Sequence, residues 1–147
     1  MSRFDADLLA TSICGGTLPF AVLGLGPNPA DPRPSQLTEV RRLDALIRNL
    51  PPGASWGLGE GSYQGEREAC VVVLGLDWPE DAVKLGRTIG QESILWHEPG
   101  IEPALYYCDG SRRVPLGRVR PGPAPSGDWS GLYVHGGALA RFHCPEA

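Results

Sequence analysis

An unbroken apolar run at residues 69–74, ACVVVL, constrains the fold of this chain more than any other feature. A β-branched run without polar alternation predicts a strand that is covered on both faces and lies in the centre of a sheet. A turn at residues 75–80, a helical stretch ending at residues 89–90 and a second apolar run at residues 94–96 follow. Residues 69–96 therefore predict a strand–helix–strand unit, around which the other elements are arranged.

The preceding residues predict another strand and helix. Residues 19–25, PFAVLGL, are apolar on both faces, so this strand is also expected to be central. The prolines in residues 27–34 exclude regular structure there, because proline lacks a backbone donor and keeps its predecessor extended. Apolar residues at three- and four-residue spacing then predict a helix that starts at the N-cap Ser35 and ends before residues 51–53.

Two further local patterns complete this part of the chain. Residues 55–59 are expected to form an outer strand, and the polar, glycine-containing residues 60–67 a turn. Asp77 with Glu80 predicts a capping box at the start of the second helix, where Pro79 is tolerated in the first turn. Gly90 is expected to end that helix in a left-handed conformation.

Residues 19–97 thus give the order strand, helix, strand, strand, helix, strand. This order predicts an α+β, ferredoxin-like β-α-β-β-α-β sandwich, with two helices on one face of an antiparallel sheet. Residues 98–147 are expected to be β, with hairpin turns at residues 109–110 and 136–137. We therefore expect a single domain, residues 1–147, with an α+β core at 19–97 and a C-terminal β-hairpin extension at 98–147 that covers the open sheet face.

Composition and charge narrow the class of protein. The chain has 147 residues and a net charge of −4, which argues against a dedicated nucleic-acid binder. The acidic N-terminus does not resemble a secretory signal, and no apolar run has the length of a membrane span. Cys14, Cys70, Cys108 and Cys144 are widely spaced and form no C-x-x-C pair. These features predict reduced thiols, a cytoplasmic location and no association with a membrane.

The sequence contains no recognisable catalytic or metal-binding signature. His97, His135 and His143 lack structural-zinc spacing relative to one another and to the cysteines. There is no G-x-S-x-G motif, and the pair Gly24 and Gly26 before a proline is a poor phosphate loop. We therefore expect no catalytic residues, no metal and no cofactor, although a Cys/His pair formed in space stays open.

One basic cluster stands out near the C-terminus. It contains Arg112, Arg113, Arg118 and Arg120, and the aromatic residues Tyr106, Tyr107 and Trp129 occur in the neighbouring sequence. Basic and aromatic side chains on a sheet can bind single-stranded nucleic acid. The alternative, which we favour, is a solvated hairpin edge that its charges protect from aggregation.

The order of several short motifs resembles a small bacterial and phage family of unknown function, DUF-three-two-nine-three. The motifs are residues 20–23 (FAVL), Asn28-Pro29, Glu68 ahead of residues 71–73 (VVV), Gly75, Gly90-Gln91 and residues 94–96 (ILW). The resemblance covers roughly residues 19–97. The chain departs from it at Glu39, where the family tends to have Asn followed three residues later by Arg, the position that Arg42 fills here. The resemblance implies a fold but no activity.

The resemblance also indicates where a ligand site could lie. Asn28, Glu68 and Gln91 are polar residues expected at strand ends, where ligands often gather, and Arg42 is expected on the first helix. Each also has a structural explanation: Asn28 could hold the proline turn, Gln91 could satisfy carbonyls at the end of the second helix, and Glu68 and Arg42 could form an ion pair. The sequence leaves these alternatives open.

We therefore expect a non-catalytic binding domain that acts on a partner protein, as an accessory protein of a phage or of a bacterial defence system. The first alternative is an enzyme or sensor that binds a small nucleotide-like ligand at Asn28, Arg42, Glu68 and Gln91. The second is a nucleic-acid-binding accessory protein that uses the arginines at 112–120. Homodimerisation through an edge strand is a further expectation, because the outer strands, although short, show no marked protection against pairing.

Overall fold

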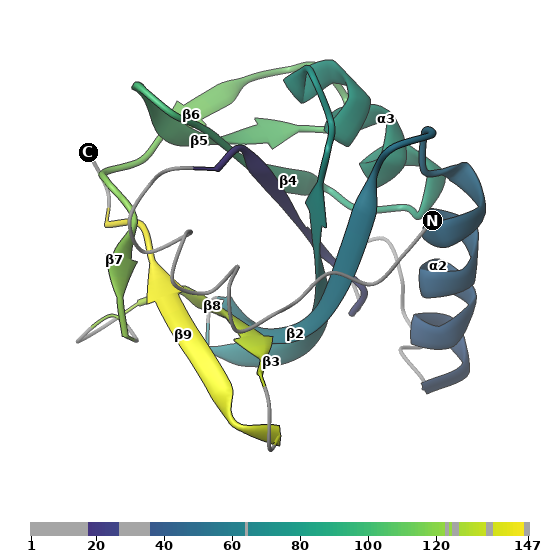
Figure 1. The fold of residues 1–147 in the computed structure, drawn as a ribbon, viewed down its shortest axis with the longest axis horizontal. Coiled ribbons are helices and arrows are strands. Elements are labelled where there is room, and N and C mark those ends of the chain that lie inside the picture. Colours follow the sequence, from purple (N-terminus) through teal and green to yellow (C-terminus); the bar gives the residue numbers. More distant parts are fainter. Residues whose placement is uncertain are drawn as a thin grey trace.

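The computed structural model describes residues 18–26, 36–63, 65–122, 124, 127–134 and 137–145. These residues form nine strands and two helices (Figure 1). In chain order the elements are β1 (Phe20–Gly24), α2 (Gln36–Asn49), β2 (Ser55–Tyr63), β3 (Glu66–Leu74), α3 (Pro79–Thr88), β4 (Ser93–Glu98), β5 (Ile101–Tyr107), β6 (Arg113–Pro115), β7 (Arg120–Pro121), β8 (Trp129–Tyr133) and β9 (Leu139–His143).

All nine strands belong to one antiparallel sheet with the order β6-β5-β4-β1-β3-β2-β8-β9-β7. Figure 1 shows the sheet curling round on itself into an open barrel, with both helices on its outer side and away from β7 and β9. A strand that is apolar on both faces suits the middle of this sheet. The two apolar runs form β1 and β3, which pair with each other and are central, as their sequences predict.

The predicted ferredoxin-like sandwich is wrong. The order of elements over residues 19–97 is the one expected, but β2 and β4 are not the edges of a four-stranded sheet. β4 pairs with β5, and β2 pairs with β8, so residues 98–147 continue the same sheet on both sides. With the added strands the sheet curls round, and side chains on its inner face pack against one another. This face therefore needs no separate covering layer.

The sequence also misplaced the hairpin between β2 and β3. We expected a turn at residues 60–67, but β2 extends to Tyr63 and β3 begins at Glu66, with their register continuous from Ser55↔Leu74 to Tyr63↔Glu66. Glycine normally weakens strands, which made this stretch look like a loop. Here the three glycines of β2, at 57, 59 and 61, alternate with larger residues and face the inside of the curl.

Two apolar cores lie on the two faces of the sheet. The outer core, between the sheet and the helices, contains alternate residues of the central strands, such as Ala21, Leu23, Val71 and Val73, together with Leu46 of α2. The inner core fills the curl and includes residues from distant parts of the chain: Phe20, Val22, Cys70, Val72, Val119, Leu132 and Phe142. The C-terminal strands therefore contribute directly to the interior of the fold.

Small residues allow the sheet to bend sharply where β2 meets β8. A Cβ atom at Gly59 would overlap the carbonyl oxygen of Gly131, and one at Gly131 would lie 2.9 Å from Leu139 Cγ. A Cβ at Gly61 would lie 2.7 Å from the hydroxyl oxygen of Tyr63, whose ring covers that glycine. Glycines at such positions permit the strong curvature that closes small barrels.

The ends of α3 confirm one prediction and correct another. Gly90 has a φ angle of +77°, and the backbone N–H of Gln91 donates to Gly86 O over 2.8 Å, a glycine-terminated helix end as expected. At the other end the N-cap is Trp78, without a side-chain capping bond, so the predicted capping box of Asp77 with Glu80 is wrong. The predicted N-cap of the first helix, Ser35, lies outside the described residues.

Both edges of the described sheet are poorly suited to pairing with another sheet. β6 has three residues and β7 has two, and each contains an arginine and a proline. Short edge strands with charge and proline discourage edge-to-edge association. These edges therefore argue against edge-strand pairing as the route to a homodimer.

Candidate functional site

Polar side chains gather on the inner face at one end of the curled sheet. This is the end at which β1 and β2 finish and β3, β4 and β8 begin. The strand register places Glu68 opposite Gly61, and Gly61 opposite Ser130, in one row across three strands. We call Tyr63, Glu68, Gln91 and Ser130 the mouth cluster.

The Glu68 side chain packs over Gly24, the last residue of β1, and over Gly26, two residues later. Its Oε2 is 2.6 Å from the position that a Cβ at Gly26 would occupy, and its Oε1 fills the corresponding space over Gly24. Burial raises the pKa of Glu68 to about 7, and Glu39 adds to this effect, while Arg42 and the Gly26 backbone N–H oppose it. The carboxyl group is therefore close to half-ionised at neutral pH.

Gln91 and Arg42 reach the same short segment of backbone. Gln91 Nε2 donates to the carbonyl oxygen of Gly26 over 3.2 Å, and Arg42 Nη1 donates to Leu25 O over 3.1 Å and also to Gly26 O. The other end of the Gln91 amide, Oε1, lies 3.0 Å from the Cβ position of Gly24. Two acceptor oxygens, one from Gln91 and one from Glu68, thus occupy the space above Gly24.

These contacts decide between some of the structural explanations. Arg42 directs its guanidinium to backbone carbonyls, and its positive charge also lowers the pKa of Glu68. The Gln91 side chain donates to Gly26 O, just beyond β1. The carbonyl at the end of α3, Gly86 O, accepts from the backbone N–H of Gln91 and not from its side chain. Asn28 lies outside the described residues. Three of the four predicted ligand-binding residues are therefore near one another.

Sequence reasoning missed the other half of the mouth cluster. The hydroxyl groups of Tyr63 and Ser130 are 2.6 Å apart, and Ser130 is only 3% exposed. Burial raises the pKa of Tyr63 well above its usual value, and the negative charges of Glu68 and Asp128 add to the shift. The two residues are 67 positions apart in the chain. Their meeting depends on the pairing of β2 with β8, which no local pattern signals.

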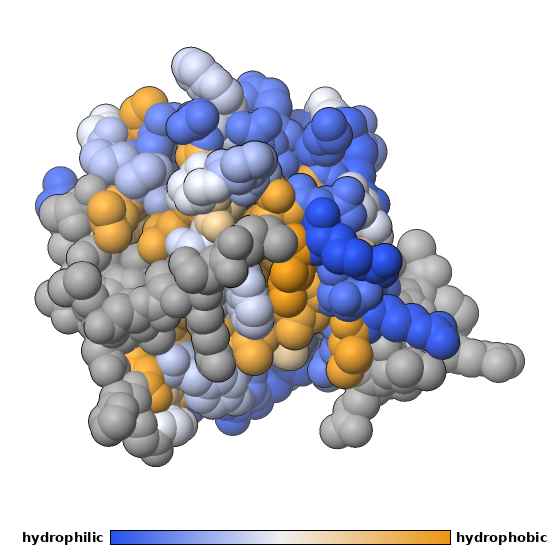
Figure 2. Space-filling view, turned by 45° about the vertical axis from the view of Figure 1, so that its right-hand side comes forward, coloured by the Kyte–Doolittle hydropathy of each residue, from blue (hydrophilic) through white to orange (hydrophobic). Residues whose placement is uncertain are grey.

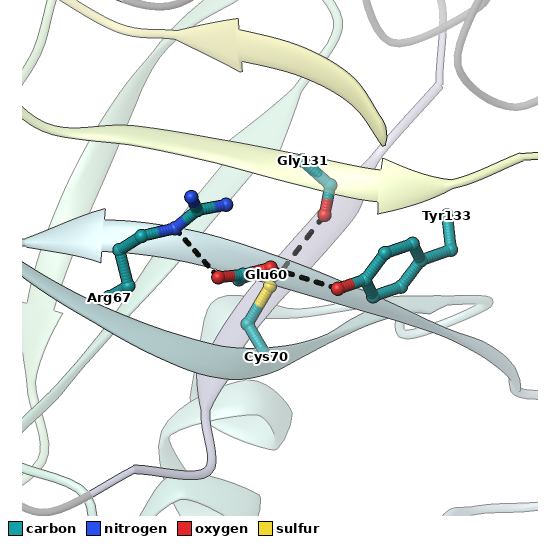
Figure 3. Close-up of polar contacts among 5 residues, drawn as sticks. All are labelled: Glu60, Arg67, Cys70, Gly131 and Tyr133. Carbon is teal, nitrogen blue, oxygen red and sulfur yellow. Dashed lines mark hydrogen bonds and ion pairs between the residues drawn. The ribbon is translucent and has the colours of Figure 1, made fainter. Parts of the chain in front are cut away.

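The described residues offer little for nucleophilic or metal chemistry. Burial raises the pKa of the Cys70 thiol to about 12, and its Sγ donates to Gly131 O over 3.8 Å, so the thiol stays protonated at neutral pH (Figure 3). Within the described ranges there is no group of three or more histidine, cysteine, aspartate or glutamate residues placed to hold a metal ion.

A second polar and aromatic surface lies on the outer face of β2, β3, β8 and β9. The guanidinium groups of Arg67 and Arg141 lie 5.3 and 4.4 Å from the centre of the Trp129 ring. Figure 3 shows Glu60 between Arg67 and Tyr133: Arg67 Nε is 2.7 Å from one carboxylate oxygen, and the Tyr133 hydroxyl donates to the other over 2.8 Å. We call Arg67, Trp129, Tyr133 and Arg141 the outer arginine face.

The predicted basic cluster is not one surface of the sheet. Arg112 stacks on Tyr107 at 4.1 Å, and Arg113 stacks on Tyr106 and donates to its hydroxyl over 3.1 Å, at the β5–β6 edge. Arg118 and Arg120 are exposed, and Arg120 lies on β7 at the opposite end of the strand order, where it faces His143 of β9. Arg120 is therefore one strand away from Arg141.

Exposed apolar side chains lie on several separate elements. On the face drawn in Figure 2, hydrophobic residues form a band beside hydrophilic ones. The large apolar residues that are exposed among the described ones are Leu18, Val40, Trp78, Ile101 and Tyr133. Tyr133, at 40% exposure, belongs to the outer arginine face, where it lies close to charged groups.

Comparison with known proteins gives no relative. No protein-family model matches the chain, and no curated protein matches it. The resemblance to DUF-three-two-nine-three therefore stays a prediction. Neither of the two described helices has the length and apolar character needed to cross a membrane.

Proposed function

We propose that this protein is a non-catalytic binding domain that acts in the cytoplasm by engaging a partner protein through the outer arginine face. The observation that carries the proposal is the contact of two guanidinium groups with the half-buried ring of Trp129. Tryptophan, tyrosine and arginine are the residue types that contribute most to binding at protein interfaces.

The location of this face supports the proposal. The residues alternate with inner-core residues along β3, β8 and β9, so their side chains point away from the interior. Both helices lie elsewhere on the outer side of the sheet (Figure 1). The Arg67 side chain is 53% exposed and Tyr133 40% exposed, so their polar groups are accessible to a partner.

The charges on this face favour a partner with an acidic surface. Arg67, Arg141 and the neighbouring Arg120 outnumber Glu60, although the whole chain carries a net charge of −4. Complementary charges raise association rates and disfavour partners of like charge. An acidic protein with one arginine-rich face would therefore approach a partner in a defined orientation.

The experiment is a quantitative pull-down from native lysate with the full chain and three variants. Trp129→Ala and Arg141→Ala should lose a protein that the wild type captures, while the control Arg48→Ala, which changes an exposed side chain of α2, should retain it. With the captured protein purified, Trp129→Ala should weaken binding about 30-fold, the effect of removing one dominant interface residue.

Two outcomes would contradict the proposal. Capture that is indifferent to Trp129 and Arg141 would exclude this face as the interface. Capture that disappears on nuclease treatment would instead favour the alternative of a nucleic-acid-binding accessory protein, whose phosphates the same arginines could contact.

A further inference from the structure

Arg141 of the outer arginine face and the neighbouring Arg120 lack a carboxylate partner. Arg67 is paired with Glu60, whereas Arg141 and Arg120 join no ion pair among the described residues. Arg120 is exposed, and the Arg141 guanidinium rests on the Trp129 ring, 4.4 Å from its centre. The net positive charge of this face therefore lies on Arg141 and Arg120.

The strand register sets the spacing of these two arginines. Arg120 of β7 lies directly opposite His143 of β9, and Arg141 comes two residues before His143 on the same strand. All three side chains lie on one face of the sheet, opposite to Phe142 in the inner core. Diagonal neighbours of this kind lie about 7–8 Å apart. Arg120 and Arg141 therefore leave the sheet side by side.

Stacking on Trp129 leaves the Arg141 guanidinium able to bind a ligand. A guanidinium that lies over an aromatic ring keeps its N–H groups along its own edges, where they can form two parallel bonds to one carboxylate. The ring already carries Arg67 as well as Arg141, so a nucleic-acid base has to displace one of them in order to stack there. These contacts favour carboxylates over single-stranded nucleic acid.

We propose that the partner of the outer arginine face presents an extended acidic segment with two carboxylates at alternate positions, one bound by Arg141 and the other by Arg120. This inference rests on the proposed function and specifies the chemistry of its partner. An extended chain advances about 3.3 Å per residue and its alternate side chains share a side, so such carboxylates lie about 7 Å apart. This spacing matches that of the two arginines. Adjacent acidic residues would point to opposite sides and offer only one carboxylate.

The test is an NMR titration of the full chain, at low salt, with two synthetic peptides of equal charge and blocked ends. Ser-Glu-Ser-Glu-Ser carries its carboxylates at alternate positions, and Ser-Glu-Glu-Ser-Ser carries them at adjacent positions. The alternating peptide should saturably shift the amide signals of Arg120 and Arg141 and the indole N–H signal of Trp129. It should bind about tenfold more tightly than the adjacent peptide, which forms one charge-assisted contact fewer.

Three variants locate the two carboxylates. Arg120→Ala and Arg141→Ala should each weaken binding of the alternating peptide about tenfold and remove its advantage over the adjacent one. Arg112→Ala is the matched control, because it removes another exposed arginine that stacks on a ring, Tyr107, near the opposite edge of the sheet. This control should leave both affinities unchanged.

Several results would overturn the inference. They are equal binding of the two peptides, an equal loss in Arg112→Ala and Arg141→Ala, or a six-nucleotide oligothymidylate that shifts the same signals at lower concentrations than the alternating peptide. The last result would favour the nucleic-acid alternative. Failure of both peptides to bind would also overturn it, while the proposed function would still stand if capture from lysate depends on Trp129 and Arg141. Both fail together only if that capture is also indifferent to these residues.

Discussion

Glu68 is a carboxylic acid held where its charged form is disfavoured, and this has a consequence for stability. Its pKa of about 7 in the folded protein exceeds the value of about 4.3 expected in an unfolded chain. The folded state therefore binds this proton more tightly. The stabilisation is fully present below about pH 4.3 and is lost as the pH rises through about 7.

As the pH rises from about 4.5 to about 8, we expect the free energy of unfolding of the wild type to fall relative to that of Glu68→Gln. Because Glu68 is only partly buried, solvent reduces the effect, and the expected change is about 1–2 kcal/mol in the free energy of unfolding. Urea unfolding followed by circular dichroism across this range measures it, with Glu66→Gln as the control for loss of a carboxylate. Parallel pH profiles of the wild type and Glu68→Gln would show that the carboxyl group is not desolvated.

The hydrogen bond between Tyr63 and Ser130 gives a second test at this scale. In Tyr63→Phe the buried Ser130 hydroxyl loses its 2.6 Å partner, and we expect a cost of about 1–2 kcal/mol. Tyr133→Phe is the matched control, because it removes a hydroxyl bonded to Glu60 on the exposed outer face and should cost less than about 0.5 kcal/mol. Equal losses of unfolding free energy in the two variants would mean that the Tyr63 hydroxyl is not buried as described.

Among the secondary-structure elements, β2 is the strand on which sequence reasoning and the structure differ most. Its helix-facing residues, such as Trp56 and Leu58, are apolar, which is why residues 55–59 were predicted as a strand. Its inner face carries glycines, and glycine in a sequence normally indicates a turn. The approach of β8, from a distant part of the chain, explains Gly59, since a Cβ there would overlap Gly131 O. Gly61 is instead covered by the ring of Tyr63.

Gly59→Ala tests this explanation. The new Cβ would overlap the backbone of Gly131, and backbone cannot move aside as a flexible side chain can, so we expect a loss of about 2–4 kcal/mol. Ser62→Ala, on the outer face of the same strand, should change stability by less than about 0.5 kcal/mol. The measurement is urea unfolding of both variants. A fully stable Gly59→Ala protein would show that β2 and β8 are not so closely packed.

The residues of the candidate site also differ in whether the sequence could predict them. Glu68 and Gln91 could be found from the sequence because each lies next to a strand that its own apolar run makes evident. Arg42 could be found because the helix pattern is strong. Tyr63 and Ser130 could not, since the sequence predicts a turn at residues 60–67, which include Tyr63, and a separate hairpin that includes Ser130. Local patterns thus located residues beside clear elements, and long-range pairing decided the rest.

For the whole molecule, the main question is whether residues 1–97 can fold without the strands that follow. The expected ferredoxin-like core would be complete at residue 97. In the structure, however, Val22 and Val72 of the central strands are covered on the inner face by a core that includes Val119, Leu132 and Phe142. Without residues 98–147, this apolar surface would lose its contacts with these side chains, and β2 and β4 would lose their partner strands β8 and β5.

We therefore expect a chain of residues 1–97 to lack a cooperative unfolding transition and to give a poorly dispersed NMR spectrum. The control is the full chain with a protease site in the exposed turn at residues 109–111, cleaved after folding. It retains every strand and should still unfold cooperatively, because packing of the inner core does not require that peptide bond. Cooperative unfolding of the 1–97 chain, with dispersed amide signals, would instead mean that its four strands form a stable sheet and that the later strands only add to it.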